Sequence, residues 1–505
     1  MKRSTMMVSE TSVLRASLTS GLIGLALACG GSAPPASGPP GSTEQAPPTE
    51  AGGPDRSGLP AAGPAPVWAP PVPTTWELKG GARVIQQTHG NVPLVSVYLV
   101  IPRGAETDSV KQAGLTFLMA DLLDEGAGKL GALELSERLQ SLATDVGVST
   151  SVDVVGVYMN TIAENFGASM DLFADIVRRP KFDEKEFQRR KAQAVAQALA
   201  NEADPHTGRR AAVTRGLFGD GYAGSAPTGT PDTLGALALS DIKAQFARLM
   251  VSEGATFVVV GGISKEAVAE HLERTFGDWG GKAKTEARPL SPAADAGKLY
   301  FVDYPGAAQS VIGVARRVPG ADAEDLFPAS VFNRSFGESF TSRVNLNLRE
   351  DKGYTYGAGS AFQRFRKVGL FGIFSDVRTD VTRASLDEVL RELSEVCSSR
   401  PLTADERDAS VNGLLLGFPS TFESINEVAS RFGQLPVYGR PLDWYQHWPE
   451  RTKAVSLEQA NEVGKRYCDK SQFVLAVAGD KAKVLPTLEG IGYAPVEIDA
   501  RGRLK

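Results

Sequence analysis

The feature that most constrains this chain is an internal repeat, because the same order of elements occurs twice along it. Val95–Val97, at the start of an alternating run, is answered by Ser310–Ile312, and the buried run Phe257–Gly261 is answered by Phe473–Val477. Self-similarity over this length indicates duplication of a whole domain. Chance likeness between two halves of mixed composition is the alternative.

Hydrophobic periodicity predicts strands and helices in alternation within the first copy. The expected elements are a strand at Val95–Ile101, helices at Gly114–Leu123 and Leu133–Leu142, a hairpin of Val148–Asp153 with Val155–Ile162, helices at Asp183–Asn201 and Leu239–Leu249, and a buried strand at Thr256–Val260. This order predicts an α+β fold, with two tandem homologous domains at residues 76–287 and 298–505 and a linker at 288–297. Each domain is expected to be a mainly antiparallel sheet covered by helices.

The N-terminus has the pattern of an export signal over residues 1–28. Lys2 and Arg3 precede an apolar stretch, Leu18–Ala28, that is too short to span a bilayer as a permanent helix. Small residues then lead to Cys29, as in bacterial lipoprotein cleavage sites, which predicts that Cys29 is diacylated and anchors the chain. The alternative is ordinary secretion after a cut near Ala28, which would leave Cys29 as a free thiol.

Residues 30–75 are rich in Pro, Gly, Ser, Ala and Thr and show no apolar periodicity. Such a composition predicts a disordered tether between the lipidated Cys29 and a folded body. The expected location is therefore the periplasmic face of a bacterial cell envelope. Gly30 provides no inner-membrane retention signal, which favours the outer membrane.

Composition excludes several classes of protein and site. The net charge of -5 is dispersed along the chain, which argues against a nucleic-acid partner. Four histidines leave little room for a histidine-based metal site, and three cysteines exclude a disulfide-rich scaffold. Cys397 and Cys468 could pair in an oxidising compartment, but sequence does not show whether they lie close enough.

The segment Ala113–Asp121 resembles the A-G-L-A-H-F-L-E-H segment of the pitrilysin/insulinase-type zinc peptidases, which include the mitochondrial processing peptidase. The resemblance covers about residues 76–490 and implies that the two domains form one half of a clamshell. In that family the inverted motif H-x-x-E-H puts two histidines on one helical face to bind zinc, with the glutamate as general base. A distal glutamate on a later helix completes the site.

The zinc motif is lost at every position of this sequence. Phe117 stands at the first histidine position, Ala120 at the glutamate position and Asp121 at the second histidine position, while the distal glutamate falls near Gln197. A lone carboxylate does not hold zinc. No histidine offers a substitute, because all four are isolated: His89, His206, His271 and His447. We therefore expect no metal in this chain and no hydrolysis by it alone.

The second half retains a different family pattern. Residues 342–357 resemble S-R-L-x-x-x-L-R-E-x-x-G-x-x-Y, in which an Arg and a Tyr reach from the non-zinc half into the catalytic chamber. The matching residues are Arg349 and Tyr356. A guanidinium can grip substrate carbonyls, and a phenol can donate to a developing oxyanion. The structural alternative is that Arg349 pairs with Glu350 or Asp351 and that Tyr356 packs in a strand.

Three functions remain open from the sequence. The first is a non-catalytic, substrate-binding subunit of a heterodimeric metallopeptidase, which binds extended peptide partly by strand addition and supplies Arg349 and Tyr356 to a homologous, zinc-bearing partner. The second is a peptide-binding or scaffold pseudo-peptidase of the cell envelope without a catalytic partner. The third is a self-sufficient metallopeptidase with an unrecognised set of ligands.

Overall fold

The computed structural model describes residues 68–90, 92–291 and 295–505. The predicted signal peptide, Cys29 and most of the predicted tether lie outside these ranges. The first half contains a six-stranded sheet in the order β1-β2-β6-β3-β5-β4, and the second a six-stranded sheet in the order β12-β7-β11-β8-β10-β9. The strands are β1 (Thr74–Glu77), β2 (Arg83–Gln87), β3 (Leu94–Ile101), β4 (Asp145–Thr150), β5 (Val155–Ile162), β6 (Thr256–Gly261), β7 (Lys298–Asp303), β8 (Gln309–Pro319), β9 (Thr355–Arg364), β10 (Val368–Arg378), β11 (Val474–Gly479) and β12 (Ala494–Ile498).

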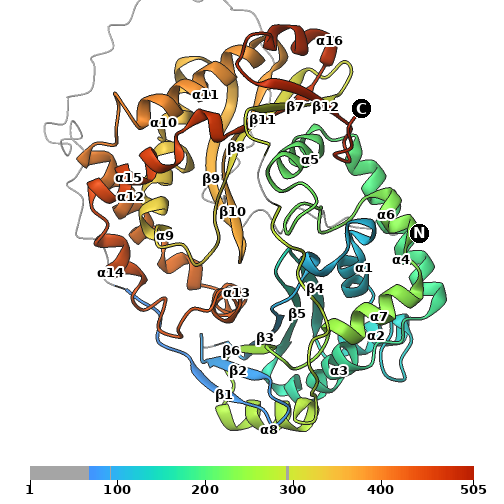
Figure 1. Ribbon diagram of the computed structural model, residues 1–505. Helices are drawn as coiled ribbons and strands as arrows, with labels where there is room; N and C mark the ends of the chain where they lie inside the picture. Colours follow the sequence, from blue (N-terminus) through green and yellow to red (C-terminus); the bar gives the residue numbers. More distant parts are fainter. Residues whose placement is uncertain (1–67, 91, 292–294) are drawn as a thin grey trace, which may run out of the picture. The chain divides into compact units, whose positions relative to one another are not determined.

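Both sheets are mixed but mainly antiparallel. In the first sheet only β2 and β6 pair in parallel, and in the second β7 pairs in parallel with β11 and β12. Helices cover both sheets, as Figure 1 shows. The predicted α+β class, with two helix-covered and mainly antiparallel sheets, is therefore confirmed.

The main helices and the two larger hydrophobic cores follow the duplication. The helices of the first half are α1 (Leu115–Asp121), α2 (Ala132–Ser141), α3 (Phe166–Arg178), α4 (Glu184–Glu202), α5 (Pro205–Phe218), α6 (Pro231–Ala236), α7 (Leu239–Leu249) and α8 (Lys265–Phe276). Those of the second half are α9 (Leu326–Asn333), α10 (Arg343–Asn345), α11 (Thr382–Val396), α12 (Ala404–Gly417), α13 (Ile425–Val437), α14 (Trp448–Lys453), α15 (Leu457–Tyr467) and α16 (Lys481–Val484). One core lies between the first sheet and α1, α3, α7 and α8, and the other between the second sheet and α9, α11 and α15.

The halves exchange one helix each, which covers the other face of each sheet. Helix α5 of the first half packs on β7, β8 and β11, and α13 of the second half packs on β3 and β6 (Figure 1). The α5 contact depends on small residues: a Cβ on Gly216 would lie 2.6 Å from Cγ1 of Val474. Glycine therefore permits the close approach of this helix to the sheet.

The strand register shows how the two copies align. Val97 of β3 lies opposite Val259 of β6, and Ile312 of β8 lies opposite Val477 of β11. The repeat seen in the sequence aligns β3 with β8 in this same register. It aligns β6 with β11 two residues away from the structural match. The reason is that it pairs Phe257, which lies within β6, with Phe473, which lies just before β11.

Several cross-links join segments that are far apart in the sequence. Cys397, after α11, and Cys468, after α15, form a disulfide with their Cα atoms 6.2 Å apart, which settles the pairing that sequence left open. Trp68, which sequence placed in the tether, packs against Phe418 and Phe422 of the second half. Among the described residues, no helix has the length and apolar character needed to cross a bilayer.

Candidate functional site

Helix α1 carries the positions of the lost zinc motif. Gly114, with a φ of 91°, precedes the helix, and Leu115, Leu118 and Met119 are buried on its apolar face. This is the periodicity that predicted the helix. Ala120, at the position of the family's general base, is also fully buried and has no group that can transfer a proton.

Asp121 and Arg190 form an ion pair between α1 and α4. The Arg190 Nε donates to Asp121 Oδ2 at 2.7 Å, and its Nη2 donates to Oδ1, so the guanidinium grips both carboxylate oxygens. Both side chains are less than one-third exposed. Arg190 also lies 3.5 Å from Oε1 of Glu125, which pairs with Arg189 as well. Two guanidinium groups thus pair with the Asp121 and Glu125 carboxylates at the end of α1.

Burial shifts the pKa values of the acids at the end of α1, Asp121 and Asp124. Desolvation raises the pKa of Asp121, and the Arg190 guanidinium opposes that increase. Desolvation also raises the pKa of Asp124 to about 6, and the nearby Glu125 carboxylate adds to the increase. The pKa of Arg190 is raised by its acidic neighbours despite its own burial, so this residue stays cationic.

Gln197, at the position of the distal glutamate, lies exposed on α4, where its side-chain amide donates to Asn201 at 2.8 Å. Arg190 lies seven residues, or two helical turns, before Gln197 and therefore on the same face of α4. Arg190 was not among the site residues predicted from the sequence. Its helical spacing from Gln197, together with an acid at position 121, is the signal that could have found it.

These residues do not fit a zinc ion. A zinc site needs three or four nitrogen, sulfur or oxygen ligands, and here the single carboxylate that remains is held by a guanidinium. Within residues 68–90, 92–291 and 295–505, no group of three or more His, Cys, Asp and Glu side chains is placed to hold a metal ion.

The four histidines contact different parts of the structure. His89 Nε2 lies 2.9 Å from the Glu423 carbonyl oxygen, and His206 Nε2 lies 3.2 Å from Asp376 Oδ2. His271 packs edge-on against Phe166, and His447 Nε2 lies 3.4 Å from Asp443 Oδ2. Each histidine has its own neighbours, and the structure does not bring them together.

The retained motif of the second half forms a wide helical turn, η5 (Leu346–Asp351), followed by strand β9. Gly353 ends the turn in the left-handed region, with a φ of 62°, and Tyr354 packs against the hydrophobic core of the second half. The chain then enters β9 at Thr355.

A β-bulge turns Tyr356 outward. Ser375 of β10 pairs with Ala358, and Val377 pairs with Thr355, so Tyr356 and Gly357 together oppose one residue of β10. Bulges of this kind redirect side chains and are common beside active sites. The Tyr356 side chain is 92% exposed, which contradicts the structural alternative that it packs within a strand.

Arg349 has a stacked position on the same motif. Its guanidinium lies 4.5 Å from the ring centre of Phe340, which is itself 65% exposed, and its Nε lies 3.5 Å from Oε1 of Glu350. The contact with Glu350 is the one that the structural alternative predicted, although both side chains remain substantially exposed. The cation–π contact with Phe340 orients the Arg349 guanidinium and leaves its N–H donors accessible.

Strands β4 and β9 end their sheets at equivalent positions. Each pairs with one neighbouring strand, β5 or β10, among the described residues. An edge strand can present unpaired backbone donors and acceptors to which an extended peptide can add. On β9, however, the Ala358 amide already donates to Asn345 Oδ1 at 3.1 Å, and the Ser360 carbonyl accepts from Asn333 Nδ2 at 3.2 Å. The edge strand β9 also carries Tyr356.

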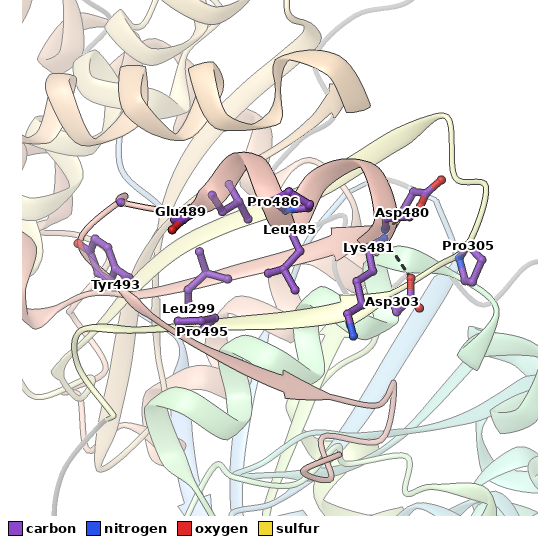
Figure 2. A pocket seen from close by; sticks show the side chains of 13 residues that line it. Leu299, Asp303, Pro305, Asp480, Lys481, Leu485, Pro486, Glu489, Tyr493 and Pro495 are labelled. Atoms are coloured by element: carbon purple, nitrogen blue, oxygen red, sulfur yellow. Dashed lines mark hydrogen bonds between the residues drawn. The ribbon is translucent and has the colours of Figure 1, made fainter.

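A hollow of 780 Å³ lies beside the other edge of the second sheet, between α16 with the following turn and strands β7 and β12 (Figure 2). Its lining is largely apolar and includes Leu299, Leu485, Tyr493 and Pro495. At one end of the hollow, the Asp303 carboxylate already accepts a hydrogen bond from the Lys481 backbone amide at 3.1 Å. None of the predicted site residues lines this hollow.

Two family models match this chain. The model of the insulinase family, peptidase family M16, matches residues 83–225, and the model described as the peptidase M16 inactive domain matches residues 236–414. The chain belongs to the M16 family. The segment with the lost zinc motif falls in the first match, and the segment with Arg349 and Tyr356 falls in the second.

Relatives of this M16 chain are distant but extend over most of its length. It is 23% identical to the non-peptidase homolog YmxG of Helicobacter pylori, over 79% of this chain and 92% of that protein. It is 22% identical to an uncharacterized zinc protease of Mycobacterium leprae, over 81% of this chain and 92% of that protein. A crystal structure of a peptidase M16 inactive domain from Pseudomonas fluorescens shares the fold, with a TM-score of 0.75, 20% identity, and coverage of 81% of this chain and 98% of that one.

Proposed function

We propose that this chain is a pseudo-peptidase subunit, which binds extended peptide and completes the active site of a zinc-bearing M16 partner. The absence of the motif residues and the Asp121–Arg190 pair support the first part of the proposal. The descriptions of its matches, as an inactive M16 domain and a non-peptidase homolog, agree with it.

The observation that carries the second part is the exposed phenol of Tyr356. A tyrosine that is 92% exposed contributes little to the packing of its own sheet, and the bulge in β9 lies at this residue. Arg349, seven residues earlier, is stacked on Phe340 with donors that remain accessible. Together they offer a hydrogen-bond donor for a developing oxyanion and a fork for substrate carbonyls.

Substrate peptide would add to a sheet edge. Strand β4 offers the freer edge among the described residues, because in β9 the Ala358 amide already donates to Asn345 and the Ser360 carbonyl already accepts from Asn333. Backbone pairing gives affinity with little dependence on the peptide sequence, which suits a subunit that presents varied extended chains.

An envelope scaffold without a catalytic partner is the second candidate. It is favoured by the contact of Arg349 with Glu350 at 3.5 Å, which gives this arginine a partner within its own chain. The proposed lipid anchor at Cys29 would place either form of the protein at the periplasmic face of the outer membrane. Labelling with a radioactive fatty acid, compared between the wild type and Cys29→Ser, tests the anchor.

The test of the proposed function is peptide hydrolysis by three samples: this chain, a homologue with an intact H-x-x-E-H motif from the same organism, and an equimolar mixture, with zinc content measured for each. The proposal predicts hydrolysis that is much faster in the mixture than in either single sample, with zinc only in the homologue. A mixture no faster than the homologue alone would favour the scaffold. Stoichiometric zinc in this chain would favour a self-sufficient metallopeptidase.

A further inference from the structure

Small residues surround Phe374 on the face of the second sheet that α5 covers. Phe374 of β10 lies directly opposite Gly313 of β8 and Gly359 of β9, so the three positions share one face. Ala361, the next position of β9 on this face, is exposed. Helix α5 packs on β7, β8 and β11. The strip formed by Gly359, Ala361 and Phe374 is therefore a part of this face with few side chains of its own.

Arg209 extends from α5 across the sheet to this strip. A Cβ on Gly313 would lie 3.3 Å from the Arg209 Cδ, so the absence of a side chain at position 313 gives the arginine its path. The guanidinium carbon then lies 4.5 Å from the ring centre of Phe374. This cation–π contact holds the guanidinium at the border of the strip.

The Arg209 guanidinium donates no hydrogen bond to any of the described residues. Its Nε is fully buried without an acceptor, whereas Nη1 and Nη2 keep accessible surface. The two acids nearby, Asp376 and Asp204, form no ion pair with it. Asp376 Oδ2 lies 3.2 Å from His206 Nε2, and Asp204 accepts from the His206 amide at 2.9 Å. Because largely buried charges are normally paired, these free donors indicate an anionic ligand.

The strip lies close to Tyr356 in the sheet. Asp376 follows Phe374 by two residues on β10, which is about 7 Å along the strand. At the β-bulge, Tyr356 and Gly357 together oppose Asp376. A peptide bound at Tyr356 can therefore reach Arg209 within a few residues. The inference that follows rests on the peptide binding proposed above.

We infer that Arg209 binds a carboxylate of the substrate peptide and gives this subunit a preference for acidic peptides. The planar guanidinium matches a carboxylate, and its accessible nitrogens, Nη1 and Nη2, can each donate to one carboxylate oxygen. Arg210, which is exposed, adds positive charge next to it. The small side chains of Gly359 and Ala361 leave room for the peptide beside the Phe374 ring.

The test is calorimetric titration of the purified chain with three acetylated peptides of the form Ala-Thr-Ala-Thr-X-Thr-Ala-Thr-Ala. The first has Glu at X and a C-terminal amide, the second has Gln and an amide, and the third has Gln and a free C-terminal carboxylate. We expect a carboxylate to tighten binding at least about fivefold over the second peptide. A gain by the first peptide assigns the site to an acidic side chain, and a gain by the third to the peptide C-terminus. Equal binding of all three would overturn the inference and leave peptide binding intact, whereas no binding by any would overturn both.

Variants separate recognition from folding. Arg209→Gln should abolish the preference for a carboxylate. Asp376→Asn removes a negative charge near Arg209 and should tighten the acidic peptide about threefold, a gain that misfolding cannot produce. Arg274→Gln, which removes an exposed arginine on α8, is the control and should keep the preference. A preference that persists in Arg209→Gln, or the absence of a gain in Asp376→Asn, would overturn the inference.

Discussion

The carboxylate of Asp121 on α1 accepts two hydrogen bonds from the guanidinium of Arg190 on α4. Asp121 stands at the second histidine position of the family's zinc motif, and α4 is the helix expected to carry the distal glutamate. A cationic side chain therefore joins the two helices that a zinc ion would join in an active relative. This interaction links α1 to α4, and the two helices also share the hydrophobic core of the first half.

The first prediction concerns the stability provided by this pair. Asp121→Ala leaves the partly buried Arg190 without its main partner, and we expect the free energy of unfolding to fall by about 2–3 kcal/mol, since breaking such a pair leaves an uncompensated charge. Urea unfolding followed by circular dichroism measures the change.

The double variant Asp121→Leu, Arg190→Leu is the control for this prediction. An apolar pair of similar volume often replaces a buried ion pair without loss of stability, so most of the deficit should be recovered. Equal destabilisation by the single and double variants would show that the charges are not what matters at this position.

The second prediction concerns zinc binding by a repaired motif. We expect the variant Phe117→His, Ala120→Glu, Asp121→His, Gln197→Glu to bind zinc poorly, because the Arg190 guanidinium stays near the new ligands and repels a divalent cation. Addition of Arg190→Gln should raise zinc content toward one ion per chain, as read by elemental analysis of dialysed protein. Full zinc occupancy with Arg190 present would contradict this role.

The sequence predicted the helix and the loss of its motif, but not what replaced the metal. Gly114, Leu115 and Leu118 are enough to identify α1, because its apolar face survives. Arg190 was missed because its partner lies 69 residues away and the pairing depends on how α4 packs against α1. The motif predicts Tyr356 as a site residue, whereas the bulge beside it in β9 is not revealed by the sequence.

The third prediction is a pH dependence that originates at Glu106. This side chain is 1% exposed, accepts from the Gly104 amide at 2.7 Å and pairs at 2.9 Å with Arg366 from the second half. Burial raises the pKa of Glu106 from 4.5 to about 7, although Arg366 opposes the increase. Because the folded state favours the protonated form of Glu106, this residue adds to the free energy of unfolding below about pH 4.5. That contribution is lost as the pH rises toward 7.

The variant Glu106→Gln removes this titration. The difference in unfolding free energy between pH 5 and pH 8 should shrink by about 2 kcal/mol in the variant, and urea unfolding at both pH values measures it. Asp108 and Asp124, whose pKa values are each raised to about 6, retain a smaller dependence of the same sign. Glu324 is exposed, so the control variant Glu324→Gln should keep the wild-type difference in unfolding free energy between pH 5 and pH 8. The same difference in Glu106→Gln as in the wild type would contradict the assignment to Glu106.

The fourth prediction concerns the disulfide of Cys397 and Cys468, which lie 71 residues apart in sequence. Closing a loop of this length restricts the unfolded chain, so the double serine variant should lose about 3–4 kcal/mol of unfolding free energy. The measurement is urea unfolding with and without dithiothreitol. Reductant should destabilise the wild type and leave the double variant unchanged; a similar effect of reductant on both would contradict this explanation.

The exchange of helices between the two halves could not be predicted from periodicity. Helix α5 carries glycines and arginines among its apolar residues, and its pattern does not indicate that it covers a sheet of the other half. Its spacing of Gly208, Ala212 and Gly216 is a sign of close packing, but the sequence does not name the partner surface. Long-range packing of this kind is decided by both sheets together.

The fifth prediction compares two tyrosines of the retained motif. Tyr356→Phe removes a phenol oxygen from a side chain that is 92% exposed, so stability should not change, whereas hydrolysis by the mixture with the zinc-bearing homologue should fall at least about a hundredfold, as for the loss of an oxyanion donor. Tyr354→Phe, on the core side of the same strand entry, is the matched control and should retain activity. Initial rates with a fluorogenic peptide measure both.

The most direct measurement is a titration of the zinc-bearing homologue, at fixed concentration, with increasing amounts of this chain while peptide hydrolysis is followed. We expect the rate to rise and saturate at one chain per homologue, and the double variant Arg349→Ala, Tyr356→Phe to saturate at the same ratio with little gain in rate. Hydrolysis that does not rise even in excess of this chain, or that rises equally with the double variant, would contradict it.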